Sequence, residues 1–245
     1  VLEVGMGGEL DSTNVIGAPE LAIITNIGLD HTRELGPTIH DIASAKAGII
    51  KPGCDVLIYD QNPEADEVFA SVCLSRGAKL HITGHSRISN VAASLNALTF
   101  DCAPYGTLSC GLVGTYQAKN AAVAITAIEI LQQKGWNISE QNLRDGLISV
   151  RWPARFELLR RNPIFIADGG HNPQGIAAVT ESLKQHFPDR KITFLIGIMA
   201  DKDIPHMIDL LAPLAKDFVT VTPDNPRALH ADVLAAMLTE RGLTA

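Results

Sequence analysis

The chain has 245 residues, of which 46% are hydrophobic and 5% aromatic, so it can form two ordinary domains or one large one. Its 20 Lys+Arg and 27 Asp+Glu give a formal charge of −7, and no basic cluster exists, which excludes a non-specific nucleic-acid-binding face. The sequence contains no apolar run of about 20 residues, the length that a membrane span needs. Its four cysteines include no C-x-x-C pair, so they indicate neither a zinc site nor a disulfide framework, which fits a protein of the reducing cytoplasm.

Apolar runs that resemble strands alternate with segments of helical periodicity, which predicts an α/β fold with a mostly parallel sheet. The first half is predicted to contain strands at 1–4, 21–28, 55–59, 96–102 and 106–114, and helices at 38–50, 63–76, 116–134 and 139–148. Residue 1 is a valine, and the run at 1–4 reads as a strand already under way. We therefore expect the sequence to be cut from a longer protein.

Pro153 and a return to strand character suggest a domain boundary near residues 149–155. The pattern then restarts, with strands expected at 163–170, 191–197 and 217–222 and helices at 174–186, 204–214 and 229–241. The sequence therefore predicts two α/β domains, 1–150 and 151–245.

Two nucleotide-binding fingerprints are not met. Gly5, Gly7 and Gly8 suggest G-x-G-x-x-G, but Leu10 stands where the last glycine is needed and no helical pattern follows. No G-x-x-x-x-G-K-[ST] phosphate loop occurs in these residues. A Rossmann oxidoreductase is therefore a poor interpretation.

Three residues at the first half's predicted strand and helix ends could hold a metal. Glu3 and His31 follow predicted strands at the sheet edge where ligands bind, and with phosphate oxygens and water they would suit Mg²⁺ or Mn²⁺. Taken alone, His31 is better explained as part of a capping or hydrogen-bonded pair with Asp30. Lys46 lies among small residues, where burial lowers the pKa of an amine; a neutral amine can take up CO₂ as a carbamate, although a surface lysine is the simpler alternative.

Other polar residues gather at predicted helix starts and turns. Gln117 and Asn120 begin the long helix and could bind a base or phosphate, although capping explains their spacing better. Arg155 offers a bidentate donor for phosphate. Asp168 and His171 lie on a strand-to-helix turn, which is more typical of a site than of a core.

Together these stretches resemble the folylpolyglutamate synthase family, including its bifunctional dihydrofolate synthase form, which is related to the Mur ligases. The matching blocks follow the family order and span nearly the whole chain: "LEVGMGGELDSTNVI", "ITNIGLDHTRELGPTIHDIASAKAGIIKPG", "GTYQAKNAAVAI", "RWPARFELL", "IADGGHNPQG", "GIMADKDI" and "NPRALHADVLAAML".

The resemblance implies an ATP-dependent ligase with a central ATPase domain (1–150) and a smaller Rossmann-like C-terminal domain (151–245), the site lying between them. ATP would phosphorylate a carboxylate of folate or dihydropteroate, and the amine of L-glutamate would attack the acyl phosphate. We further expect a monomer that acts on small molecules, without nucleic acid or membrane.

Individual roles follow from the same resemblance. Glu3 and His31 match metal-ligand positions, and Lys46 matches the lysine whose carbamate would hold a second Mg²⁺. Asp11 matches a pterin contact. The remaining matches concern ATP and L-glutamate: Asn120, Gln117 and Arg155 for ATP, and Asp168 and His171 for nucleotide and incoming glutamate, with Lys46, Arg155 and His171 as catalytic residues.

Two departures from the family pattern affect the interpretation. Glu9 replaces the usual arginine, which leaves the acceptor open between folate, dihydropteroate and both. The family's phosphate loop precedes the segment and is missing, and a C-terminal strand and helix are missing as well, so we expect this chain alone to be inactive. The alternatives are a Mur-type ligase acting on a UDP-linked muramic acid and a non-catalytic binding module.

Overall fold

The computed structural model describes residues 1–60 and 62–245. The main chain divides into two compact units, which are described separately. The first unit contains Val1–Val91, Thr99–Cys110 and Gln117–Ser149, and the second contains Ala92–Leu98, Gly111–Tyr116 and Val150–Ala245. The predicted division into domains 1–150 and 151–245 stays a prediction, because compactness alone does not show that either part folds independently.

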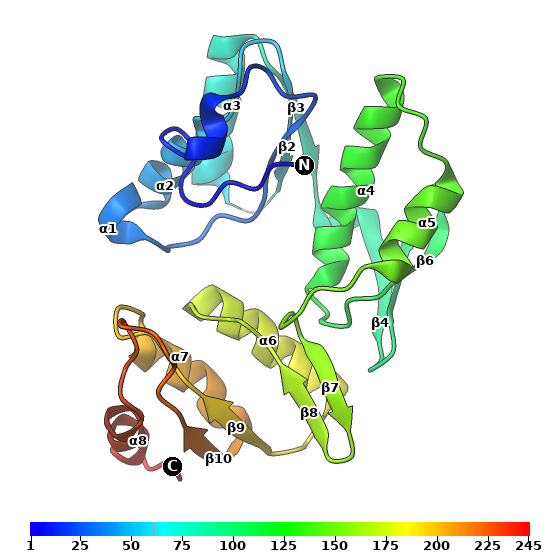
Figure 1. The fold of residues 1–245 in the computed structure, drawn as a ribbon. Helices are drawn as coiled ribbons and strands as arrows, with labels where there is room; N and C mark the ends of the chain where they lie inside the picture. The colour runs from blue at the N-terminus through cyan, green and yellow to red at the C-terminus, as the bar shows by residue number, and fades with distance from the viewer. Residues whose placement is uncertain (61) are drawn as a thin grey trace. The chain divides into compact units, whose positions relative to one another are not determined.

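The first half of the chain forms a mixed set of helices and strands, drawn in blue to green in Figure 1. In order they are η1 (Ser12–Val15), β1 (Ala22–Ile24), α1 (Thr32–Leu35), α2 (Ile39–Ala47), β2 (Asp55–Tyr59), α3 (Pro63–Arg76), β3 (Lys79–Thr83), η2 (His85–Arg87), β4 (Ile88–Ala93), β5 (Leu98–Cys102), β6 (Gly106–Cys110), α4 (Gln117–Gln133) and α5 (Glu140–Ser149).

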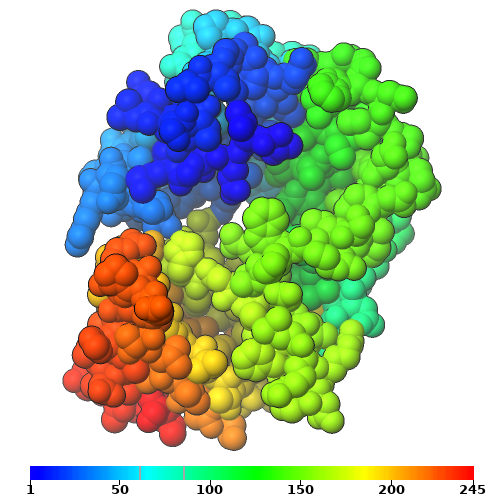
Figure 2. Space-filling model, in the orientation of Figure 1, coloured from blue at the N-terminus to red at the C-terminus, as the bar shows by residue number. Residues whose placement is uncertain are grey.

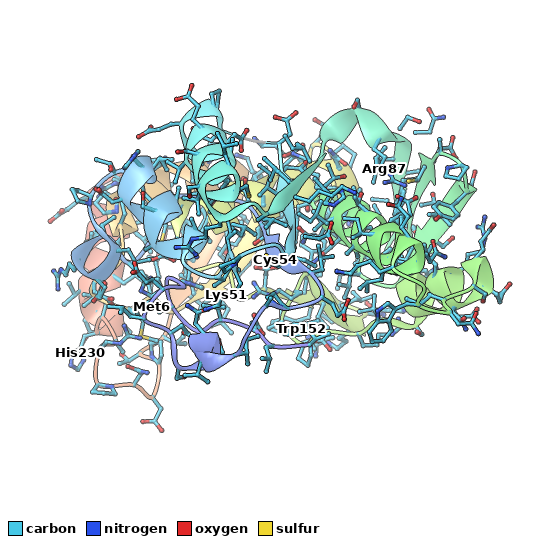
Figure 3. The ribbon with its side chains drawn as sticks, turned by 90° about the horizontal axis from the view of Figure 1, so that it is seen from above. Met6, Lys51, Cys54, Arg87, Trp152 and His230 are labelled. Carbon is cyan, nitrogen blue, oxygen red and sulfur yellow. The ribbon has the colours of Figure 1, made fainter. Side chains whose placement is uncertain are left out.

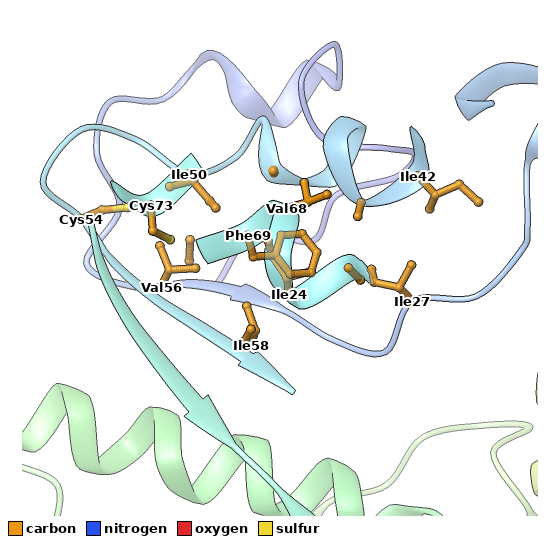
Figure 4. Packing of buried hydrophobic residues seen from close by; sticks show 14 residues of the cluster. Ile24, Ile27, Ile42, Ile50, Cys54, Val56, Ile58, Val68, Phe69 and Cys73 are labelled. Carbon is orange, nitrogen blue, oxygen red and sulfur yellow. The ribbon is translucent and has the colours of Figure 1, made fainter. Parts of the chain in front are cut away.

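β1, β2 and β3 form a parallel sheet in that order, with helices on both faces. Successive side chains of a strand point to opposite faces. Val56 and Ile58 of β2 therefore pack among α2 and α3, and Figure 4 shows this cluster around Phe69. Leu57 and Tyr59 pack against α4 instead. Because β2 is buried on both faces, it reads as a continuous apolar run, which is typical of parallel sheets.

Two helices that pack against this sheet have clear capping residues. The Asn62 side chain accepts a hydrogen bond from Glu64 N at the start of α3, and Gly77 ends it with a left-handed φ of 60°. A capping box between Thr38 and Asp41 starts α2.

The second half of the chain forms β7 (Glu157–Arg161), β8 (Ile164–Ala167), α6 (Pro173–His186), β9 (Ile192–Ile196), α7 (Ile204–Leu211), η3 (Ala212–Leu214), β10 (Ala215–Thr220) and α8 (Ala231–Thr239). β7 and β8 are antiparallel, and β9 and β10 are parallel. A buried cluster that includes Met207, Ile208 and Phe218 forms a core of this half.

Residues 111–116 belong to the second unit, and hydrogen bonds tie them to α6. Thr115 N donates to Ser182 Oγ at 3.0 Å, and the two hydroxyl oxygens lie 2.9 Å apart. His186 Nε2 donates to Val113 O at 2.9 Å. Since Ser182 is fully buried, these bonds satisfy a hydroxyl that would otherwise be costly to bury.

The α/β fold class is confirmed, but one predicted strand is absent. Residues 1–4 form no strand; Val1 and Leu2 are exposed, and Figure 2 shows the N-terminal segment in dark blue at the surface. A strand exists only where a neighbour pairs with it. β4 was not predicted, because four of its six residues are exposed and give no apolar pattern. No described helix is long and apolar enough to cross a bilayer.

Candidate functional site

The glycine-containing loop at residues 5–13 is organised by Asp11. Its Oδ2 accepts hydrogen bonds from Gly5 N and Met6 N, both at 3.0 Å. Its Oδ1 accepts from Thr13 N at 2.9 Å and from Thr13 Oγ1 at 2.6 Å. Led by the Thr13 hydroxyl, these bonds lower the pKa of Asp11 to about 2. Asp11 therefore has an internal role in addition to any predicted pterin contact.

The same loop lies against the carboxyl end of α2. Glu9 N donates to Ala45 O at 2.9 Å. A Cβ atom on Gly8 would lie 2.8 Å from the carbonyl oxygens of Ala45 and Lys46, and one on Gly48 would lie 2.4 Å from Glu9 Cα. Glycine is thus required for the close approach of two main-chain segments, and that approach brings the loop to the helix turn that carries Lys46.

Asn14 and Lys51 strengthen this approach. Asn14 Nδ2 donates to Glu9 O at 3.1 Å and to Gly48 O at 3.3 Å. Lys51 Nζ donates to Asn14 O at 3.1 Å, and Figure 3 shows Lys51 beside the loop that carries Met6. The loop is therefore anchored by side chains as well as by main-chain bonds.

Lys46 is half-buried in the last turn of α2. Burial lowers the pKa of its ammonium group, and the nearby Asp30 carboxylate partly offsets this by raising it. A lysine with a lowered pKa has a larger neutral fraction at a given pH, which is the form that reacts with CO₂. The sequence-based expectation that Lys46 differs from an ordinary surface lysine has this physical support.

The predicted metal ligands Glu3 and His31 are both exposed. His31 is the N-cap of α1 with a left-handed φ of 52°, and its main-chain N donates to Asp30 Oδ1 at 2.9 Å. Among the described residues, no group of three or more His, Cys, Asp or Glu side chains is placed to hold a metal ion. A site built from Glu3 and His31 would therefore need oxygens from the substrate, from water or from a carbamate.

Gln117 and Asn120 lie one turn apart at the start of α4, as predicted from the sequence. Asn120 Nδ2 donates to Gln117 Oε1 at 2.9 Å, so the two amides bind each other. Gln117 is 5% exposed, whereas Asn120 is exposed. This bond orients Asn120. Of the two amides, Asn120 is the exposed one and is therefore accessible to a ligand.

Arg155 is exposed and lies between two residues with strained backbones. Ala154 has a φ of 54° and Phe156 a φ of 53°, in the left-handed region that residues with a side chain rarely adopt. Phe156 is fully buried, and its ring stacks on that of His186 with centroids 5.2 Å apart. The strained turn therefore presents Arg155 outward while its neighbour is fixed in the core.

Hydrogen bonds hold this turn in place. Gly169 N donates to Ala154 O at 2.8 Å, and Ala154 N donates to Glu157 Oε2 at 2.9 Å. Asp168 Oδ2 accepts from Phe156 N at 2.8 Å and from the Tyr116 hydroxyl at 3.1 Å. The predicted site residues Arg155 and Asp168 are thus brought together through the main chain.

The turn after β8 also fixes His171. Its Nδ1 lies 2.9 Å from Gly169 O, and because a carbonyl only accepts, Nδ1 carries the hydrogen. In the neutral ring Nε2 is then the acceptor. The Asn172 side chain caps α6 by accepting from Gly175 N at 2.8 Å, with Pro173 in the first turn. His171 therefore stands next to a helix N-terminus, where anions are stabilised.

Two family models match the chain. The Mur ligase middle domain matches residues 1–128, and the Mur ligase, glutamate ligase domain matches residues 154–245. The chain belongs to the Mur ligase family.

Among the Mur ligases, the chain is similar to folylpolyglutamate synthase of Lacticaseibacillus casei, with 39% identity over 94% of this chain and 55% of that protein. It is 32% identical to dihydrofolate synthase/folylpolyglutamate synthase of Escherichia coli, over 96% of this chain and 53% of that protein. A structure of Mycobacterium tuberculosis folylpolyglutamate synthase complexed with ADP and AMPPCP matches with a TM-score of 0.87 and 31% identity, covering 98% of this chain and 55% of that one. The chain spans about half the length of the curated relatives it matches, and the family resemblance expected from the sequence is confirmed.

Several residues that shape the candidate site were not singled out from the sequence. Tyr116 and Glu157 hold the Arg155 turn, and Phe156 anchors it in the core. No short-range pattern marks them, because their partners lie on other elements. Only Pro153, next to the turn, gave a sequence signal.

Proposed function

We propose that the protein is an ATP-dependent ligase that joins L-glutamate to folate, as in folylpolyglutamate synthase, to dihydropteroate, as in dihydrofolate synthase, or to both. The observation that supports this most strongly is the similarity to folate–glutamate ligases over almost the whole chain, in both Mur ligase domains. The Mycobacterium tuberculosis relative, which was solved in complex with ADP and AMPPCP, supports ATP as the energy source.

The reaction couples two displacements. A carboxylate oxygen of the acceptor attacks the γ-phosphorus of ATP, the bond to the bridging oxygen breaks, and ADP leaves. The glutamate amine then attacks the acyl phosphate, phosphate leaves with its oxygen, and the amine loses a proton as the amide forms. Negative charge builds on the transferred phosphoryl group.

We assign the predicted residues to these steps by their chemistry. The exposed guanidinium of Arg155 would bind phosphoryl oxygens in a bidentate manner. Asn120, oriented by Gln117, would bind the nucleotide. His171 would bind incoming glutamate, and its Nε2, the acceptor of the neutral ring, would take the amine proton. Asp168 would act in the nucleotide and glutamate site through the turn that it holds.

Metal binding is assigned to the other end of the chain. Glu3 and His31 would be ligands of Mg²⁺, or of Mn²⁺, and Lys46 as a carbamate would supply a further carboxylate. A carboxylate, an imidazole and a carbamate, completed by phosphate oxygens, form a donor set that these ions accept. When bound, the ions would neutralise charge on the transferring phosphoryl group. Asp11 would contact the pterin of the acceptor.

The decisive experiment measures ADP release by the protein expressed from its complete reading frame, with Mg-ATP and L-glutamate. Dihydropteroate, a reduced folate and a UDP-linked muramic acid are compared as acceptors. We expect release that depends on a pterin acceptor, and the preferred pterin separates synthase from extender. Release with the sugar acid alone would assign the protein to the cell-wall branch, and no release with any acceptor would favour a binding module.

The carbamate is tested separately on Lys46. Lys46→Ala should abolish turnover, and added short-chain carboxylates should restore part of it. Carbon-13 NMR of protein equilibrated with labelled bicarbonate should show a carbamate signal that this variant lacks. Full activity of Lys46→Ala would exclude the carbamate role.

We further propose that the protein acts in the cytoplasm as a monomer on small molecules, without nucleic acid or a membrane.

A further inference from the structure

The second unit contains a cavity of about 440 Å³ that its chemistry sets apart from the rest of the chain. Four arginines line it: Arg151, Arg155, Arg160 and Arg161. Trp152, which is 54% exposed, also lines it. The chain as a whole carries a formal charge of −7, so the charge gathered at this cavity has the opposite sign to the net charge of the chain.

The cavity's one carboxylate, Glu157, accepts a hydrogen bond from Ala154 N with Oε2 and can balance at most one of the four guanidinium charges. The Arg160 guanidinium donates through Nε to Pro163 O at 3.3 Å, and Arg161 donates through Nη2 to Asn96 Oδ1. Neither arginine forms a salt bridge within residues 1–60 and 62–245. Neutral oxygens thus orient both groups while their positive charge remains available.

The arrangement of the cations favours an extended ligand over a compact one. Arg160 and Arg161 stand at the far end of β7, which begins two residues after Arg155. At ~3.3 Å per residue, β7 alone is roughly 13 Å long. An oligomer that carries one carboxylate on each residue can place successive carboxylates along such a row, whereas a triphosphate carries its charged oxygens on three phosphorus atoms joined through single bridging oxygens. Guanidinium groups bind carboxylates in a bidentate manner.

We propose that this cavity binds an extended chain of carboxylates, the chemical class of γ-linked oligoglutamate, through Arg160 and Arg161. The identity of the chain as a glutamate tail rests on the proposed function, whereas the site itself rests on the cavity and its cations. Arg155 can serve the reacting phosphoryl group while the two arginines at the end of β7 hold a part of the ligand that does not react.

Trp152 allows binding to be measured directly in the full chain without ATP or turnover. The chain has two tryptophans, and Trp136→Phe leaves Trp152 as the only one. Titration with tri-γ-glutamate should change the fluorescence of Trp152, and free glutamate should bind more weakly. Calorimetry on the same protein detects binding even if the fluorescence of Trp152 does not change. Added salt should weaken binding, since screening reduces such attractions.

Three variants make the test specific. Arg160→Gln with Arg161→Gln should weaken binding of tri-γ-glutamate by about tenfold or more, because charge-assisted hydrogen bonds are lost. The double lysine variant keeps both charges and should retain part of the affinity, which separates binding from misfolding. Arg190→Gln removes an exposed arginine outside the cavity and should leave affinity unchanged.

Several results would overturn the proposal: no binding of tri-γ-glutamate, binding of inorganic tripolyphosphate in its place, or an equal loss of affinity in Arg190→Gln. Because the measurement involves no chemical step, a failure here is distinguishable from a failure to release ADP. Pterin-dependent ADP release without cavity binding would keep the ligase assignment and remove this site.

Discussion

At the scale of single residues, the backbone on both sides of Arg155 is strained. A left-handed conformation costs a residue with a Cβ about 1–2 kcal/mol, and Ala154 and Phe156 both adopt it. The bonds from Gly169 N to Ala154 O and from Phe156 N to Asp168 hold the turn against that cost. The strain is therefore a measurable property of the turn that carries Arg155.

Replacing Ala154 by glycine should stabilise the protein. Glycine adopts a positive φ freely, and the relief exceeds the extra entropy of the unfolded chain, so we expect a gain of about 0.5–1 kcal/mol in denaturant unfolding. Ala177→Gly in α6 is the matched control and should lose about 1 kcal/mol, because glycine is unfavourable within a helix. Equal losses in both variants would mean that Ala154 is not strained.

Asp11 should give the loop at residues 5–13 a defined pH dependence. Its pKa is about 2 in the folded protein, against an ordinary value of 3.8. A carboxylate with a lowered folded pKa stabilises the fold fully above its unfolded pKa and loses this effect as pH falls. Asp11→Asn should therefore be less stable than the wild type at pH 7, and the difference should shrink between about pH 4 and pH 2.

Urea unfolding at several pH values measures this difference. Asp224→Asn is the control, because the Asp224 side chain is exposed and forms no hydrogen bond or ion pair within residues 1–60 and 62–245; its stability should follow the wild type throughout. A gap between wild type and Asp11→Asn that stays constant down to pH 2 would contradict the role of the Asp11 charge.

At the scale of elements, the loop and α2 form one packed unit through Gly48. Its backbone has an ordinary φ of −57°, so an alanine there would be limited only by the 2.4 Å approach to Glu9. Gly48→Ala should cost about 1–3 kcal/mol through overpacking. Gly146→Ala in α5 meets no atom within 4 Å and should instead be neutral or stabilising by up to about 1 kcal/mol.

Thermal unfolding of the two glycine variants provides the comparison, and the resonance of the Lys46 ε-methylene protons reports whether the helix end moves. We expect that resonance to shift in Gly48→Ala and to stay in place in Gly146→Ala. Similar stabilities for the two variants would show that the loop moves to accommodate the added methyl group without a loss of stability.

Elements were predictable where local signals mark both ends. The helix expected at 63–76 is α3, because Pro63 begins it and Gly77 supplies the left-handed end. β4 escaped prediction because its outward residues show no apolar alternation. The strand predicted at 1–4 is wrong because apolar letters alone do not supply a pairing strand.

At the scale of the whole molecule, the candidate site was predicted through its resemblance to a family and not through spacing. Asp168 and Phe156 are twelve residues apart, and their hydrogen bond depends on how β7 and β8 pair. Thr115 and Ser182 are 67 residues apart. No local rule gives such contacts, so the residue types indicated possible chemistry while the ordered blocks supplied the roles.

Each compact unit contains a hydrophobic cluster of its own, and this predicts separate responses to mutations in the two clusters. Phe69 is fully buried in the cluster around α2 and α3, and Met207 is 1% exposed in the cluster of α7 and α8. Truncation to alanine costs about 3–5 kcal/mol for Phe and 2–5 kcal/mol for Met. If the predicted domains fold independently, each variant should lose hydrogen-exchange protection only in its own unit, by roughly 30-fold or more for a loss of 2 kcal/mol. Exchange followed by mass spectrometry resolves this by peptide, and loss of protection in both units with either variant would show that the chain folds as a single cooperative domain.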